Sequence, residues 1–159
     1  MPSNAEKALA VFQKGIGNEE GPTDWHEITQ EQVNGFADAT LDHQFIHVDP
    51  ERAAQTPFGG PIAHGFLTLS LTAGLSMRMK PNPEAIQGMA MAINYGLDKV
   101  RFINPVPVGK RVRLTRKLVG ADLVAGGAAV QLKHETTVHI ENESKPACVA
   151  ETLTRFVYT

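Results

Sequence analysis

Residues 62 to 77 have the sequence IAHGFLTLSLTAGLSM, the most hydrophobic stretch of the chain. Pro61 precedes this stretch, and a proline at a helix start supplies a backbone φ angle that suits the first turn. Apolar residues fall on nearly every face of a helix built from it, so other elements have to cover that helix. The stretch is too short to cross a membrane comfortably. We therefore expect a buried central helix over residues 62–78.

The sequence after this helix predicts strands. From Val130 to Glu141 apolar and polar residues alternate, which places one face of a strand in a core and the other in solvent. Glycine and proline separate four further strand candidates, over residues 89–95, 98–103, 112–119 and 149–158. One apolar helix followed by antiparallel strands indicates an α+β protein whose curled antiparallel sheet wraps around a long central helix. This is the hot-dog arrangement.

Bulk properties favour a single domain over residues 1–159 and exclude several partners. The net charge of −2 comes from interspersed signs, so no basic face is available for nucleic acid. The amino terminus mixes charged with apolar residues and lacks the core of a secretory signal, and no segment predicts a membrane span. Cys148 has no partner for an internal disulfide, and its apolar neighbours indicate burial in a strand. We expect a cytoplasmic protein.

The first part of the chain predicts short elements. Residues 1–24 are expected to form an N-terminal helix and a loop, and residues 25–28 a short strand. Thr29 can cap a second helix that ends near Thr40, with Gln32 at the reciprocal position of a capping box.

A sheet of this size leaves one edge and part of its helix uncovered in a single copy, so we expect a homodimer.

Residues 41–61 contain three prolines and two adjacent glycines, which favours an irregular excursion with one short turn at residues 51–54. Excursions of this length often carry function. Asp42 and His47 lie five residues apart, a rotation of roughly 140° on a helix, so only a turn could bring them together. A carboxylate and an imidazole that bracket one water suit acid-base chemistry near neutral pH. The alternative is that Asp42 caps a turn and His47 is a satisfied polar residue.

A metal site is a second interpretation of the same residues, because His43 and His47 are four apart and Asp42 is adjacent. That spacing aligns ligands only on a continuous helix, and Pro50 follows closely. The glutamate of the zinc-protease motif is also missing after His43. We therefore predict no metal.

The start of the apolar helix offers a third candidate. Free backbone N–H groups and the positive end of the helix dipole favour developing negative charge there, and Gly65 allows a ligand to approach closely. The alternative is that Gly65 only permits tight packing against the sheet. Ser70 lies one turn further on, where a serine commonly bonds back to the preceding turn.

Together these segments resemble the MaoC-like, (R)-specific enoyl-CoA hydratase family of hot-dog proteins. The resemblance covers most of the chain and is carried by the ordered set Ile28-Thr29, DHQFIH over residues 42–47, PIAHGFLTLS over residues 61–70, Tyr95-Gly96, KVRF over residues 99–102, Pro105-Val106 and Gly109.

The resemblance implies a substrate, a reaction and roles for individual residues. The substrate would be a trans-2-enoyl-CoA thioester, to which the enzyme adds water without a cofactor. Asp42 and His47 would form the catalytic dyad, and the Gly65 amide would polarise the thioester carbonyl. Ser70 would lie by the acyl pocket, with Gln44 and Phe66 also at the substrate.

The sequence also departs from the family pattern. The family usually has Gly-Asp-x-Asn-Pro-x-His, whereas this chain has Leu41, Gln44 and Phe45 at the glycine, asparagine and proline positions. The variant is similar to the nodulation-protein-N-like branch of the family, so acyl-chain preference does not carry across. Arg101 and Lys110 are candidates for the coenzyme A phosphates, although solvated strand ends are the simpler interpretation of both.

Two other functions stay open at this level. A hot-dog thioesterase uses the same scaffold but sends water to the carbonyl carbon. A non-catalytic subunit would bind an acyl-CoA or a protein partner without reaction, and a pair of converging titratable groups argues against it.

Overall fold

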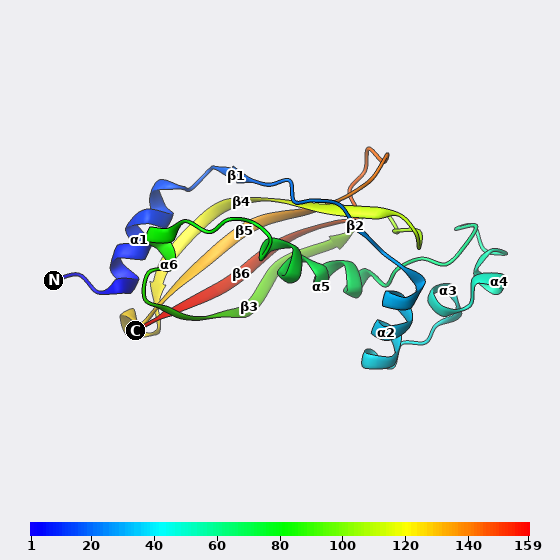
Figure 1. Ribbon diagram of the computed structural model, residues 1–159, viewed down its shortest axis with the longest axis horizontal. Coiled ribbons are helices and arrows are strands. Elements are labelled where there is room, and N and C mark those ends of the chain that lie inside the picture. Colours follow the sequence, from blue (N-terminus) through cyan, green and yellow to red (C-terminus); the bar gives the residue numbers. More distant parts are fainter.

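The computed structural model describes residues 1–159 and contains one six-stranded antiparallel sheet. The path through the sheet is β1-β4-β5-β6-β3, and β2 also pairs with β4. Figure 1 shows α1 and α6 at one end of this sheet and α2, α3 and α4 at the other. The elements are α1 (Asn4–Lys14), β1 (Glu19–Glu20), β2 (His26–Glu27), α2 (Gln30–Thr40), α3 (Phe45–Val48), α4 (Pro50–Ala53), α5 (Gly65–Ser76), α6 (Pro83–Ile86), β3 (Met89–Phe102), β4 (Arg111–Val124), the 3-10 turn η1 (Ala125–Gly127), β5 (Ala129–Ile140) and β6 (Cys148–Tyr158).

Strand β5 lies between β4 and β6 and shows the expected alternation. Val130, Leu132, Val138 and Ile140 are buried, whereas the odd-numbered residues from Gln131 to His139 are at least partly exposed. His134 and Thr136 also lie on the buried face. Cys148, at the start of β6, is buried as expected, and burial raises the pKa of its thiol to about 11.

The strands differ from the expectation at β4, which continues past Gly120 to Val124, and more strongly at β3. Residues 89–95 and 98–103 do not form two strands, because β3 pairs with β6 continuously from Met89 to Phe102. The pairing shifts register between Asn94 and Gly96 and between Leu97 and Lys99, where the sequence pattern had predicted a gap between two strands. Strand β3 is also the sheet edge, since it pairs with β6 alone.

Helix α5 is the central helix, but it is shorter than the predicted 62–78. It begins at Gly65 because the residues before it are extended: Ile62 forms a β-bridge with Pro107, and the Ala63 N–H donates to the Val106 carbonyl. Pro61 therefore does not occupy the first helical position. None of the helices has the length and hydrophobicity that a membrane span requires.

The main core lies between α5, α2 and the sheet, and includes Leu67, Leu75, Val33 and Leu114. A second, smaller cluster lies under α1 at the other end of the sheet. As expected for a single copy, part of α5 is uncovered. Phe66 is 67% exposed and Met77 is 85% exposed on its uncovered face.

Helix α2 confirms the predicted cap at Thr29, whose Oγ1 accepts from the Gln32 N–H at 3.1 Å. The reciprocal half of the capping box is wrong. The Gln32 side chain instead lies 2.9 Å from His26 Nε2, which ties α2 to β2.

Candidate active site

Asp42 lies in a short irregular segment that follows a left-handed residue. Helix α2 ends at Leu41, whose φ of 67° turns the chain sharply. Asp42 follows, and its Oδ1 accepts from the Gln44 N–H at 3.3 Å, so the carboxylate does help to form a turn. Its side chain is still 51% exposed. The carboxylate is therefore available to a ligand as well as to the local backbone.

His47 is carried by α3 and is buried, with 7% of its surface exposed. Its Nδ1 lies 2.6 Å from the Ile62 carbonyl. Because a carbonyl only accepts, Nδ1 carries the proton and Nε2 keeps a free lone pair in the neutral ring. Burial lowers the pKa of His47, and this effect outweighs the opposing effect of the bond to Ile62. The ring is thus prepared to accept a proton near neutral pH.

The site contains a second histidine, His64, to which the sequence reasoning assigned no role. It precedes Gly65 at the N-cap of α5, is 2% exposed, and stacks on the His47 ring with centroids 3.9 Å apart. Its Nε2 donates to the backbone carbonyl of Asp42 at 2.9 Å. Its Nδ1 is buried without a partner. The sequence feature that could have indicated this histidine is its position directly before Gly65, at the start of the apolar helix.

These contacts bring three titratable side chains together. One ligand atom each from Asp42, His47 and His64 lie within 4.8 Å of one another. The three side chains meet because the rings of His47 and His64 are each held by a backbone carbonyl of a segment distant in sequence. A carboxylate and imidazole ring nitrogens therefore converge at one place, which is the arrangement that acid-base handling of a water requires.

Three groups with this composition could also ligate a metal, although not the three of the sequence-based alternative. His43 is turned away and lies 2.8 Å from the Asp38 carboxylate. His47 and His64 each have one ring nitrogen engaged with a carbonyl. The absence of a metal stays a prediction.

Gly65 begins α5 beside this group, and its N–H has no acceptor within the helix because it lies in the first turn. A Cβ added at Gly65 would meet the Phe102 ring at 2.9 Å. The free amide at the helix start supports the oxyanion interpretation of Gly65, and the close approach of β3 supports the packing interpretation. The Phe66 ring contacts Phe102 edge-on, with centroids 5.6 Å apart.

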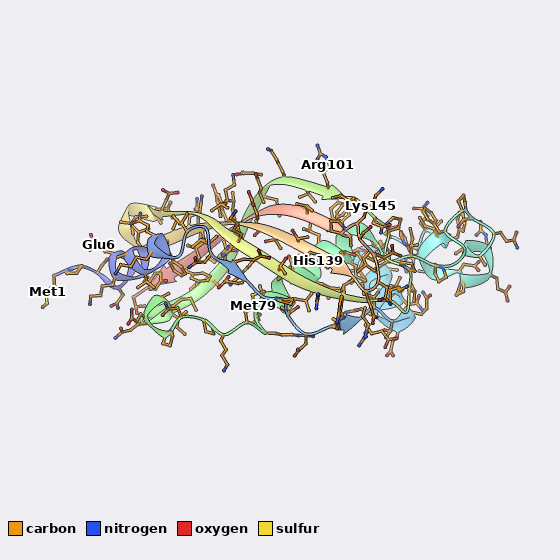
Figure 2. The ribbon with its side chains drawn as sticks, turned by 90° about the horizontal axis from the view of Figure 1, so that it is seen from above. Met1, Glu6, Met79, Arg101, His139 and Lys145 are labelled. Atoms are coloured by element: carbon orange, nitrogen blue, oxygen red, sulfur yellow. The ribbon has the colours of Figure 1, made fainter.

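The remaining candidates lie around this centre. Ser70 lines a cavity of about 340 Å³ between α5 and the sheet, while its Oγ donates to the Phe66 carbonyl at 2.7 Å. Gln44 is exposed at the N-cap of α3, where its side chain makes no capping bond. Arg101 is exposed on β3, points away from the molecule in Figure 2 and donates to the Val100 carbonyl. Lys110 is half-buried.

Comparison with known proteins decides the family. The family model described as "MaoC like domain" matches residues 11–140, which is most of the chain. The chain belongs to the MaoC-like dehydratase family.

Two relatives of this MaoC-like protein are similar over nearly their whole length. It is 53% identical over 151 residues to 3-hydroxyacyl-thioester dehydratase Z of Mycobacterium tuberculosis, covering 95% of this chain and 97% of the relative. It is 47% identical over 150 residues to nodulation protein N of Rhizobium leguminosarum bv. viciae, covering 94% and 91%.

Solved structures agree with the fold of this MaoC-like protein. The (R)-hydratase from A. caviae involved in PHA biosynthesis matches with a TM-score of 0.66 and 25% identity, over 87% of this chain and 94% of that one. A monoamine oxidase regulatory protein from Archaeoglobus matches with a TM-score of 0.73 and 23% identity, over 91% of each chain. The hot-dog fold is therefore confirmed, and the protein is a dehydratase of the MaoC family.

Proposed function

We propose that this protein adds water to trans-2-enoyl-CoA thioesters to give (R)-3-hydroxyacyl-CoA, and catalyses the reverse dehydration. The observation that carries the proposal is that the Asp42 carboxylate and a ring nitrogen of His47 lie within 4.8 Å of each other, beside His64 at the N-cap of α5. This arrangement offers an acid-base pair and an anion-stabilising group at one place.

The dyad handles the water. The Asp42 carboxylate and His47 Nε2 each accept a hydrogen bond from the same water, which leaves an oxygen lone pair for attack on the β-carbon. One water proton passes to the dyad as the carbon–oxygen bond forms. His47 delivers a proton to the α-carbon, so one water is consumed and the dyad returns to its starting state.

The start of α5 handles the charge. Attack on the β-carbon moves negative charge onto the thioester oxygen, where the free N–H of Gly65 can donate to it. A preorganised donor of this kind is commonly worth ~3 kcal/mol of transition-state stabilisation. No step requires a cofactor.

The substrate class rests on the relatives. One is named a 3-hydroxyacyl-thioester dehydratase, and a similar structure is named an (R)-hydratase. These names support a thioester substrate and the (R) product, and coenzyme A is the carrier that we propose for both directions.

We further propose that the active protein is a homodimer formed through β3. This strand is 14 residues long, pairs on one side only, and exposes the side chains of Met91, Ile93, Tyr95 and Leu97. An exposed and apolar strand edge of this length invites pairing with another strand. The uncovered face of α5 carries Phe66 and Met77, which a second copy would also cover.

A single assay tests the reaction. Purified protein is mixed with crotonyl-CoA while the absorbance of the conjugated enoyl group and the release of free thiol are followed together. Loss of absorbance without thiol is the expected result. Thiol release would instead show a thioesterase, and no change with either signal over a range of chain lengths would favour a binding subunit.

A further inference from the structure

The cavity beside Ser70 is lined by polar side chains that the proposed reaction does not use. It lies between the second half of α5 and the inner face of the sheet, and we call it the polar chamber. Arg116, His134, Thr136 and Thr152 contribute to its walls from β4, β5 and β6. An alkyl chain would be matched by an apolar wall, so these residues need another explanation.

His134 is the least expected of them. It lies on the buried face of β5, is 5% exposed, and its ring makes no hydrogen bond within the chain. Oε2 of Glu20 lies 3.8 Å from its Nε2. Burial, with a smaller effect from Arg116, lowers the pKa of His134 to about 3. The ring is therefore neutral and presents one donor and one acceptor.

Arg116 pairs with Glu20 but keeps free hydrogen-bond donors. Its Nε donates to Glu20 at 2.5 Å, and Glu20 lies directly opposite Arg116 in the β1–β4 pairing. The two Nη groups make no hydrogen bond within the chain. Thr136 and Thr152 share one hydrogen bond at 3.1 Å, which leaves their remaining capacity free. Since Glu20 neutralises Arg116, the polar chamber presents hydrogen-bonding groups without a net charge.

A second cavity of about 660 Å³ adjoins the first and extends under α1, and we call it the apolar chamber. Ser76, Arg116 and His134 line both cavities, so they form the boundary between them. Beyond this boundary the walls are mainly apolar, with Phe12, Leu132 and Phe156 among them. From Gly65 to Ser76 the helix rises ~16 Å, so the boundary lies a medium-length acyl chain away from the proposed oxyanion site.

We propose that this enzyme selects acyl chains that carry a neutral oxygen substituent, a hydroxyl or a carbonyl, part-way along the chain. The inference rests on the proposed function, because it places the thioester at Gly65 and the acyl chain along α5. The substituent bonds to His134 and to the Nη groups of Arg116 at the boundary, and the rest of the chain fills the apolar chamber. Unpaired buried polar groups disfavour a plain alkyl chain at the same place.

A carboxylate is a poorer candidate than a neutral oxygen. Glu20 already occupies the Nε of Arg116, and its own charge would lie close to an incoming anion. Neutral His134 contributes no compensating positive charge. A hydroxyl, in contrast, can donate to one ring nitrogen or accept from the other groups without bringing charge into the chamber.

Calorimetric binding of saturated acyl-CoA thioesters tests the proposal without requiring turnover. Dodecanoyl-CoA is compared with hydroxydodecanoyl-CoA isomers whose hydroxyl moves carbon by carbon along the outer half of the chain. We expect one isomer to bind about tenfold more tightly than the plain chain, the effect of one well-made hydrogen bond in a buried site. His134→Leu should reduce that preference to less than twofold.

Two further variants keep the result interpretable. Arg116→Lys removes the two Nη donors of the proposed site and keeps a positive charge opposite Glu20, so it tests the proposal if His134→Leu does not fold. Thr137→Val is the matched control, because Thr137 neighbours Thr136 on the opposite face of β5 and should keep the full preference. Equal binding of the plain chain and every isomer, or a preference that survives in both chamber variants, would overturn the proposal. Hydration of crotonyl-CoA is assayed separately, so failure of the proposed reaction is recognised independently of these affinities.

Discussion

The imidazole rings of His47 and His64 are stacked, with centroids 3.9 Å apart and planes 25° apart. The two rings are held by different backbone carbonyls, those of Ile62 and Asp42. His64 therefore touches both members of the proposed dyad, one through its ring face and the other through its Nε2. This contact makes His64 a positioning residue whose effect can be measured on His47.

The pKa of His47 should move in opposite directions in two variants. His64 lowers this pKa and Asp42 raises it, so His64→Gln should raise it and Asp42→Asn should lower it further. NMR titration of the His47 ring measures both shifts. Because the reaction needs neutral His47, the wild-type kcat/KM should fall as pH decreases, with an apparent pKa below the usual 6.5. In His64→Gln that acid limb should lie at higher pH. Shifts of the same sign in both variants would argue against this coupling.

Asp42 and His47 should behave as one unit in turnover. Asp42→Asn keeps the shape but removes the base, and His47→Gln keeps a polar side chain without its titratable proton. Each should lower kcat by several orders of magnitude while the melting temperature stays close to wild type. The double variant should be scarcely worse than either single one, whereas independent contributions would multiply. Near-normal hydration by either single variant would show that the substituted residue has a structural role and not a catalytic one.

Gly65 requires a variant pair, because its missing side chain also makes room for Phe102. Gly65→Val should reduce kcat by ~10² through intrusion on the thioester oxygen, and should also lower the melting temperature through the contact with Phe102. In Gly65→Val combined with Phe102→Leu, we expect the melting temperature to recover and kcat to stay low. Phe102→Leu alone is the reference. Recovery of both quantities together would show that Gly65 serves packing only.

The β3 edge predicts the oligomeric state. Light scattering should give twice the 17.2 kDa of one chain at micromolar concentration. Ile93→Lys places a charge on the exposed edge strand and should shift the protein toward the monomer with loss of activity. Leu123→Lys changes another exposed apolar residue, on β4, and should leave the dimer intact. A fully active wild-type monomer would contradict the prediction.

His134 should make the fold sensitive to acid. Its pKa is about 3 in the folded chain and near 6.5 when unfolded, so the unfolded state binds the extra proton first. The contribution of His134 to stability is complete above pH 6.5 and is lost as pH falls toward 3. The slope due to this one group is at most ~1.4 kcal/mol per pH unit. Urea unfolding at several pH values should show a shallower acid dependence in His134→Gln, and an unchanged slope would contradict the assignment.

Local features of the molecule were predictable from residues that lie close together in the chain. The alternation in β5, the cap at Thr29 and the short turn at α4 all follow from spacings of a few residues. The motif around Asp42 and His47 also indicated the family, which the match over residues 11–140 confirms. Such features depend on side-chain periodicity and on hydrogen bonds within one turn, both of which the order of residues encodes directly.

Only the tertiary structure decided how these parts meet. His47 is oriented by a carbonyl 15 residues away and His64 by one 22 residues away, so neither contact has a local signature. The start of α5 at Gly65 likewise depends on the bridge between Ile62 and Pro107, and the continuity of β3 on its pairing with β6. Long-range hydrogen bonds and packing override local propensity at these places, because each buried backbone group has to find a partner wherever the fold supplies one.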